Sequence, residues 1–284
     1  MTLRLPPHAP WRFFFLVFLS SVPFYLLGAI GGRLAWLPML PVSALMTFVP
    51  LLVAITLVFR EGGAQASVAL ARRLLPFSTP RIALWLLIAL LFMPVVCIVE
   101  FAALRLTGSA VSVPQITPGE AAFFFLAFFI GAIGEEVGWQ GYAYPALRTR
   151  MGVLTSAIVL GTVWALWHVI PFAQMGHSPE WILWHSLCAV ALRIIIVWLF
   201  ENTGGSLLVA VLFHTMSNVS WALFPNAGSF YDPFVTLVIL TLAVALIIVV
   251  RAPTKQGLQA KYPSRTGPNE GAPMTETDRK AGCG

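Results

Sequence analysis

Eight apolar runs, each close to twenty residues long, constrain this chain more than any other feature of its sequence. A helix of that length spans a bilayer, because it rises about 1.5 Å per residue and the hydrocarbon core is about 30 Å thick. Only 10% of the 284 residues are charged, whereas soluble domains carry about 25%. The alternating ten-residue segments of membrane barrels are absent. We therefore predict an all-α polytopic membrane bundle of about eight transmembrane helices in the lipid bilayer.

The predicted spans and the links between them divide the chain into two parts. Residues 1–251 form the eight-span transmembrane domain, with a motif core at 119–223, and the polar segment 252–284 is expected to be a disordered cytoplasmic tail. The link 60–81 is too polar to span and predicts a short helix on the membrane surface. The expected spans lie at 11–30, 40–59, 82–104, from 117 to a break near 141 or 145, 153–172, 181–200, 205–223 and 234–250.

The basic residues indicate how the bundle is oriented. Fourteen Lys and Arg residues lie in the N-terminal arm, the second and fourth links and the tail, whereas only Arg33 and Arg105 lie in the opposite links. The positive-inside rule therefore predicts a multi-pass protein of the cell membrane with both termini in the cytoplasm. The same distribution indicates membrane topology rather than a surface for nucleic acid, so no nucleic-acid partner is expected.

Two adjacent carboxylates, Glu135 and Glu136, follow an apolar run in the fourth expected span. An ionisable side chain at such a depth costs about 2.5–3.5 kcal/mol on insertion scales and marks a functional site. At helical spacing, Glu135 shares a face with glycines that let other helices approach closely, whereas Glu136 shares a different face with Gln140. We therefore expect the two acids to have different roles. The glycines are at positions 131, 134, 138 and 141.

Two later spans carry imidazole groups at helical spacing. Trp164 lies four residues before His168, and His214 lies four residues before Asn218, so each pair occupies one helix face. Apolar surroundings make a carboxylate such as Glu135 a stronger base, and we expect His168 to position the same water and shuttle its proton. His214 and Asn218 would supply two donors to an oxyanion. These residue types predict a hydrolase that activates water and forms no covalent intermediate.

The three groups resemble the motifs of the CAAX protease and bacteriocin-processing family, the type II CAAX intramembrane glutamic endopeptidases. The family's motifs are Glu-Glu-x-x-x-Arg, Phe-x-x-x-His and His-x-x-x-Asn or Asp, and here they read, in that order, Glu135 to Gln140, Trp164 to His168 and His214 to Asn218. The resemblance implies metal-independent cleavage of a peptide bond in or near the membrane, between spans four, five and seven. It implies that Glu135 and His168 activate water and that His214 and Asn218 stabilise the oxyanion. It also implies a peptide or protein substrate, lipidated or membrane-bound, and no cofactor.

Two positions depart from the family's pattern. Trp164 replaces a Phe and keeps an aromatic ring, whereas Gln140 replaces an Arg and removes the cation expected one turn from Glu136. Arg193 stands alone in the sixth expected span and needs an acidic partner there. We predict that Arg193 replaces the missing charge beside Glu136, with Glu100 as the competing partner.

Other functional classes remain open at this point. A non-catalytic binding or immunity-type protein would have the same fold. Zinc could be held by Glu135, His168 and His214, although the sequence has no His-Glu-x-x-His pattern. A haem protein with two axial histidines and a proton-coupled transporter are further alternatives. His177 and His185 are expected to lie outside the site.

Overall fold

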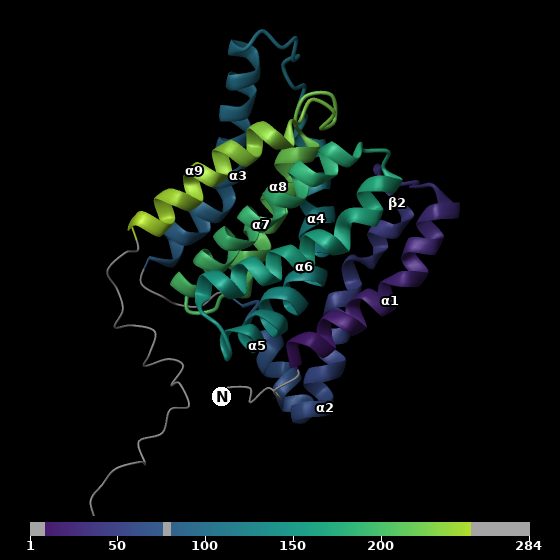
Figure 1. The fold of residues 1–284 in the computed structure, drawn as a ribbon, viewed down its shortest axis with the longest axis vertical. Coiled ribbons are helices and arrows are strands. Elements are labelled where there is room, and N and C mark those ends of the chain that lie inside the picture. The colour runs from purple at the N-terminus through teal and green to yellow at the C-terminus, as the bar shows by residue number, and fades with distance from the viewer. Residues whose placement is uncertain (1–8, 76–80, 251–284) are drawn as a thin grey trace, which may run out of the picture. The chain divides into compact units, whose positions relative to one another are not determined.

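The computed structural model describes residues 9–75 and 81–250, so the predictions for the tail fall outside the described residues. The described residues belong to one compact unit and are almost entirely helical (Figure 1). Seven helical segments in this part of the chain are long and apolar enough to cross a membrane, and α8 is a shorter apolar helix. The predicted all-α, multi-pass membrane bundle is confirmed. Its main helices are α1 (Ala9–Gly31), α2 (Val49–Arg72), α3 (Ile82–Leu106), α4 (Pro118–Gly138), α6 (Val153–Gln174), α7 (Pro179–Asn202), α8 (Leu207–Ala222) and α9 (Pro233–Val250).

The segment around the second expected span differs from the prediction. A small antiparallel hairpin, β1 (Arg33–Leu34) and β2 (Leu37–Pro41), and a 3-10 helix, η1 (Val42–Phe48), occupy the region where that span was expected to begin. The expected span at 40–59 lies largely within the apolar helical segment Val42–Arg72, but its residues 42–48 form a 3-10 helix and not a regular α-helix. The sequence could not show this difference, because an apolar run has no period that separates the two forms. Helix α2 then continues to Arg72 across a kink at Gly63, which has φ 67°.

Small residues on α4 decide how closely the neighbouring elements approach. A Cβ added at Gly134 would lie 2.7 Å from the carbonyl oxygen of Thr47, and one at Gly138 would lie 2.5 Å from that of Pro50. Both distances are shorter than real Cβ contacts. Therefore η1 and the start of α2 reach the backbone of α4, as the glycine spacing predicts.

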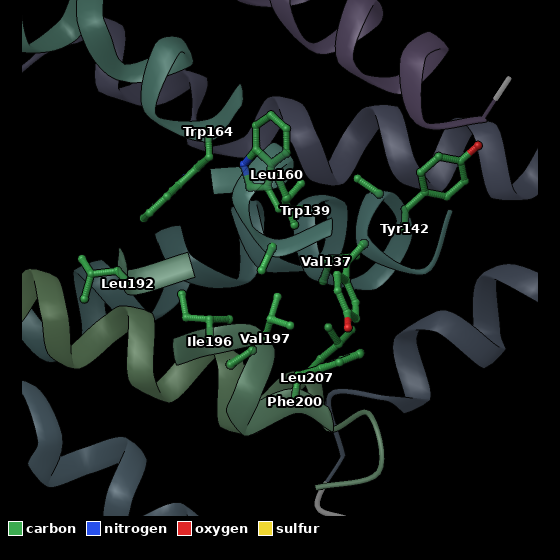
Figure 2. Packing of buried hydrophobic residues seen from close by; sticks show 14 of the residues in the cluster. Val137, Trp139, Tyr142, Leu160, Trp164, Leu192, Ile196, Val197, Phe200 and Leu207 are labelled. Carbon is green, nitrogen blue, oxygen red and sulfur yellow. The ribbon is translucent and has the colours of Figure 1, made fainter. Parts of the chain in front are cut away.

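Helix α4 changes form directly after the two glutamates. A π-helical turn, η2 (Trp139–Ala143), follows Gly138 and leads into the short helix α5 (Tyr144–Arg148). This turn is the irregularity that the sequence predicts near position 141. Its side chains pack into the main hydrophobic cluster, in which Figure 2 shows Trp139 near Leu160 of α6. The cluster also holds side chains of α7, and α6 and α7 make the most extensive helix pair of the bundle.

Candidate active site

Glu135 is held by hydrogen bonds from two different elements. The indole Nε1 of Trp164 on α6 donates to Oε2 at 2.7 Å, and the Thr47 hydroxyl on η1 lies 3.1 Å from Oε1. The same hydroxyl lies 3.0 Å from the carbonyl oxygen of Gly131, so its single proton serves two acceptors. The sequence analysis did not identify Thr47, because its segment was assigned to a regular span. The Glu135 carboxylate is therefore fixed in orientation, with Oε1 directed to the space shared with His168.

His168 faces Glu135 without touching it. Its Nδ1 lies 2.9 Å from the carbonyl oxygen of Trp164, so Nδ1 carries the proton and donates to this carbonyl. Its other ring nitrogen, Nε2, lies 3.8 Å from Oε1 of Glu135. This separation is too long for a hydrogen bond but allows one water to lie about 2.8 Å from both atoms.

Glu136 forms a separate, fully buried ion-pair network. Arg193 on α7 donates from Nη1 to Oε2 at 2.7 Å, and Nδ1 of His214 on α8 lies 2.9 Å from Oε1. The side chains of Glu136 and Arg193 have no exposed surface. The predicted pairing of Arg193 with Glu136 is present. The two adjacent glutamates therefore face different partners, as their positions on the helix predict.

The indole of Trp164 connects the two carboxylate sites. Its ring lies edge to face against His168 and His214, with centroid separations of 5.3 Å in both cases. The guanidinium carbon of Arg193 lies 4.3 Å from the centroid of the Trp164 ring, at cation–π distance. The aromatic residue that the motif spacing identified thus contacts both imidazoles, the buried cation and Glu135.

Glu100 does not pair with Arg193, and Gln140 does not pair with Glu136. Glu100 accepts hydrogen bonds from the Asp232 amide at 2.7 Å and the Thr236 hydroxyl at 2.5 Å, so it holds the start of α9 instead of Arg193. Gln140 is fully buried, and neither atom of its amide has a partner among the described residues. Gln140 lies in the π-helical turn η2 and makes no hydrogen bond to Glu136 in the part of the chain that the structure describes.

All four predicted catalytic residues, Glu135, His168, His214 and Asn218, line one cavity of about 430 Å³. Most of the remaining wall is apolar. His185, which was expected outside the site, also lines this cavity, and its ring stacks on Trp181 at 4.6 Å. The sequence around His185 does not indicate that this residue lines the cavity, since the cavity wall is assembled from separate helices.

The described part of the chain contains no group of three His, Cys, Asp or Glu side chains placed to hold a metal ion. Glu135, His168 and His214 therefore do not form such a group in this part of the chain. The arrangement instead places an unpaired imidazole nitrogen beside a carboxylate. Such a pair suits the activation of a water molecule.

Comparison with known proteins agrees with the motifs. Residues 117–220 match the family described as Rce1-like, type II CAAX prenyl endopeptidase. The protein named CAAX prenyl protease 2 of Methanococcus maripaludis is 27% identical over 150 residues, which cover 47% of this chain and 54% of that protein. The match thus spans about half the length of this curated relative. These findings confirm the resemblance that the three motifs indicate.

Proposed function

From the similarity of residues 117–220 to the type II CAAX prenyl endopeptidases, we propose that this chain is an intramembrane endopeptidase. It hydrolyses a peptide bond with a water molecule activated by Glu135 and His168, and it needs no metal. One observation carries the proposal. Oε1 of Glu135 and Nε2 of His168 lie 3.8 Å apart on the wall of a cavity that His214 and Asn218 also line.

Both groups of the proposed catalytic pair accept hydrogen bonds from the water. One water proton points to the Glu135 carboxylate and the other to Nε2 of His168, so a lone pair of the oxygen is free to attack the scissile carbonyl. In the attack the water loses one proton to Glu135, and the carbonyl oxygen becomes an oxyanion. The proton is then transferred to the leaving amine as the carbon–nitrogen bond breaks, which gives a carboxylic acid and an amine. The acid then loses its proton to the amine, so the final products are a carboxylate and an ammonium group.

The charge balance of the buried network supports a role for His214 as an oxyanion donor. Glu135, Glu136 and Arg193 together carry one net negative charge, which is costly to bury. A proton on His214 makes the group neutral. The imidazolium then donates from Nδ1 to Glu136 and has Nε2–H available for the oxyanion, and the Asn218 amide provides the second donor.

The apolar cavity wall suits a substrate with a lipid group or a membrane-embedded segment. The relative from Methanococcus maripaludis is named CAAX prenyl protease 2, and a prenyl chain is one such lipid group. The cavity of about 430 Å³ is within the range of small-molecule sites, so it accommodates a few residues of an extended peptide or part of a lipid chain.

The proposal is tested with the purified full-length chain in detergent and a quenched fluorescent farnesylated peptide that ends in a CAAX sequence. The Glu135→Gln variant keeps an acceptor for Trp164 but loses the base, so we expect kcat to fall about 10²- to 10⁴-fold. Glu120→Gln is the matched control, because Glu120 lies on the same helix but is exposed in the α4 capping box. Equal rates for Glu135→Gln and the parent chain would refute the assignment.

Chelation separates the proposal from the zinc alternative. Prolonged treatment with a strong chelator is expected to leave the hydrolysis rate unchanged, because the proposed water is activated by two protein side chains. A loss of activity that returns with added zinc would instead support zinc ligation.

A further inference from the structure

The links between the described helices gather at two opposite ends of the bundle. At one end, here called the mouth end, Arg33 donates to the carbonyl oxygen of Met175 at 3.1 Å, which joins the link after α1 to that after α6. Alternation along the chain places the α3–α4 and α8–α9 links at this end too, where Val111 and Tyr231 share one hydrophobic cluster. At the other end, here called the arginine end, Arg73 donates to the carbonyl oxygen of Gly141 at 3.1 Å.

The two ends differ strongly in charge. Among the described residues, the mouth end has two arginines, Arg33 and Arg105, together with Glu120, Glu180 and Asp232. Burial, and then the nearby Arg33, lower the pKa of His177 in the α6–α7 link, so His177 adds no positive charge there at neutral pH. The arginine end has two acidic residues, Glu61 and Glu201, and seven arginines: Arg12, Arg60, Arg72, Arg73, Arg81, Arg148 and Arg150.

The catalytic cavity reaches only the mouth end. Its lining on α6 runs from Trp164 to Phe172, which is in the half of the helix nearest that end. Trp36, Met175 and Tyr231 line the cavity from the mouth-end links. No residue that lines this cavity belongs to the arginine-end links that the structure describes. The site is therefore reached from the end that carries few positive charges.

One side of the cavity, formed by α4, also lies at the outer surface of the helix bundle. Phe123, Leu126 and Ile130 of α4 line the cavity and are 44%, 61% and 55% exposed. In a bilayer, large apolar side chains with this exposure contact lipid. A substrate held in the leaflet next to the mouth end can therefore enter from the side without crossing the bundle.

Short links rich in arginine stay on the cytoplasmic side of a membrane. We propose that the arginine end and both termini are cytoplasmic, so that the active site opens to the non-cytoplasmic face. The substrate is then a peptide segment, anchored in the membrane by a lipid or a hydrophobic stretch, that has already been translocated across the bilayer. This inference deepens the proposed endopeptidase function and rests on it for the reaction. A translocation step must precede cleavage and supply the substrate.

Cysteine labelling tests the orientation independently of any activity. Ser109→Cys at the mouth end and Thr149→Cys at the arginine end are both exposed positions. Each is made in a full-length chain with Cys283→Ser, and the native Cys97 and Cys188 are buried. In right-side-out spheroplasts, a membrane-impermeant maleimide is expected to label Ser109→Cys and to label Thr149→Cys only after lysis. The reverse pattern would overturn the inference, whatever the enzyme cleaves.

Sided membranes test substrate access. A farnesylated CAAX peptide with several lysines, which does not cross bilayers, is added to right-side-out spheroplasts and to inverted vesicles from the same cells. Hydrolysis is expected with intact spheroplasts, and in inverted vesicles it is lost until detergent is added. Hydrolysis by intact inverted vesicles alone would contradict the inference. Absence of hydrolysis even in detergent would count against the proposed function with this peptide, while the labelling pattern would still decide the orientation.

Discussion

Arg193→Gln is the most informative single substitution in this structure. Arg193 is fully buried, and its Nη1 lies 2.7 Å from Oε2 of Glu136, whose other oxygen contacts His214. The substitution keeps much of the side-chain volume but removes the guanidinium charge. Glu136 would then remain buried with His214 as its partner. The variant therefore tests whether a cation from α7 replaces the one that the family places at position 140.

The expected loss follows from the burial of both partners. Breaking a buried ion pair by removing one partner costs about 3–5 kcal/mol, and here Glu136 would lose its guanidinium partner and keep only His214. Both side chains have no exposed surface, so solvent screening does not reduce this estimate. We also expect kcat to fall, since Glu136 without Arg193 no longer holds the His214 ring in one orientation. The effect on KM should be smaller, because Arg193 does not line the cavity.

Two double variants separate charge compensation from simple packing. In Arg193→Gln with Glu136→Gln both charges are absent, so most of the lost stability should return, while activity stays low because His214 has lost its carboxylate. In Arg193→Gln with Gln140→Arg, a guanidinium returns near Glu136 from the position that the family uses. We expect this variant to recover part of the stability and part of kcat.

Stability is measured by titration with a denaturing detergent in mixed micelles, and activity with the farnesylated peptide. Arg150→Gln is the control, because Arg150 is exposed at the arginine end and its loss should change stability by less than about 0.5 kcal/mol. If Arg193→Gln is as stable and as active as the parent chain, the ion pair has no positioning role and the reasoning is refuted.

Two further predictions concern the elements that hold α4. Thr47→Val removes a hydroxyl that lies 3.1 Å from Glu135. We expect kcat/KM to fall about tenfold in the peptide assay, since a hydrogen bond to a charged group contributes about 1.5 kcal/mol. An unchanged rate would show that the hydroxyl serves Gly131 alone. Gly138→Ala places a Cβ 2.5 Å from the carbonyl oxygen of Pro50 and should destabilise the chain by about 1–3 kcal/mol in the detergent titration. The control Gly119→Ala meets no atom within 4 Å, so equal stability of the two variants would contradict the close approach of α2 and α4.

Much of the fold could be predicted because a bilayer imposes a simple rule on sequence. Apolar runs of span length must form helices, since the backbone cannot find hydrogen-bond partners in lipid. The predicted ends of the spans after residue 82 lie within a few residues of the observed helices. The hairpin and the 3-10 form of η1 could not be predicted in this way, because apolar composition does not distinguish them from a regular α-helix.

In the candidate site, too, the sequence predicts which residues share a helix face but not which residues from distant segments meet. Trp164 and His168 share one helix, as do His214 and Asn218, so a four-residue spacing is enough to place each pair on one face. Thr47 lies 88 positions before Glu135, and no local pattern connects two such residues. Arg193 was found only because an unpaired cation in an apolar span needs a partner.

The sequence by itself determined that this chain is a membrane bundle, which helices carry its polar groups and which side of the membrane is favoured by its arginines. These are consequences of hydrophobicity, helical periodicity and charge, and each acts over a short stretch of chain. Only the tertiary structure decided that Arg193 pairs with Glu136 and not with Glu100, and that the Gln140 amide has no partner among residues 9–75 and 81–250. The tertiary structure also decided that Trp36 and Tyr231 of the mouth-end links line the cavity with Glu135 and His168. Such contacts depend on the distances between helices, and close packing at glycines and the π-helical turn determine those distances.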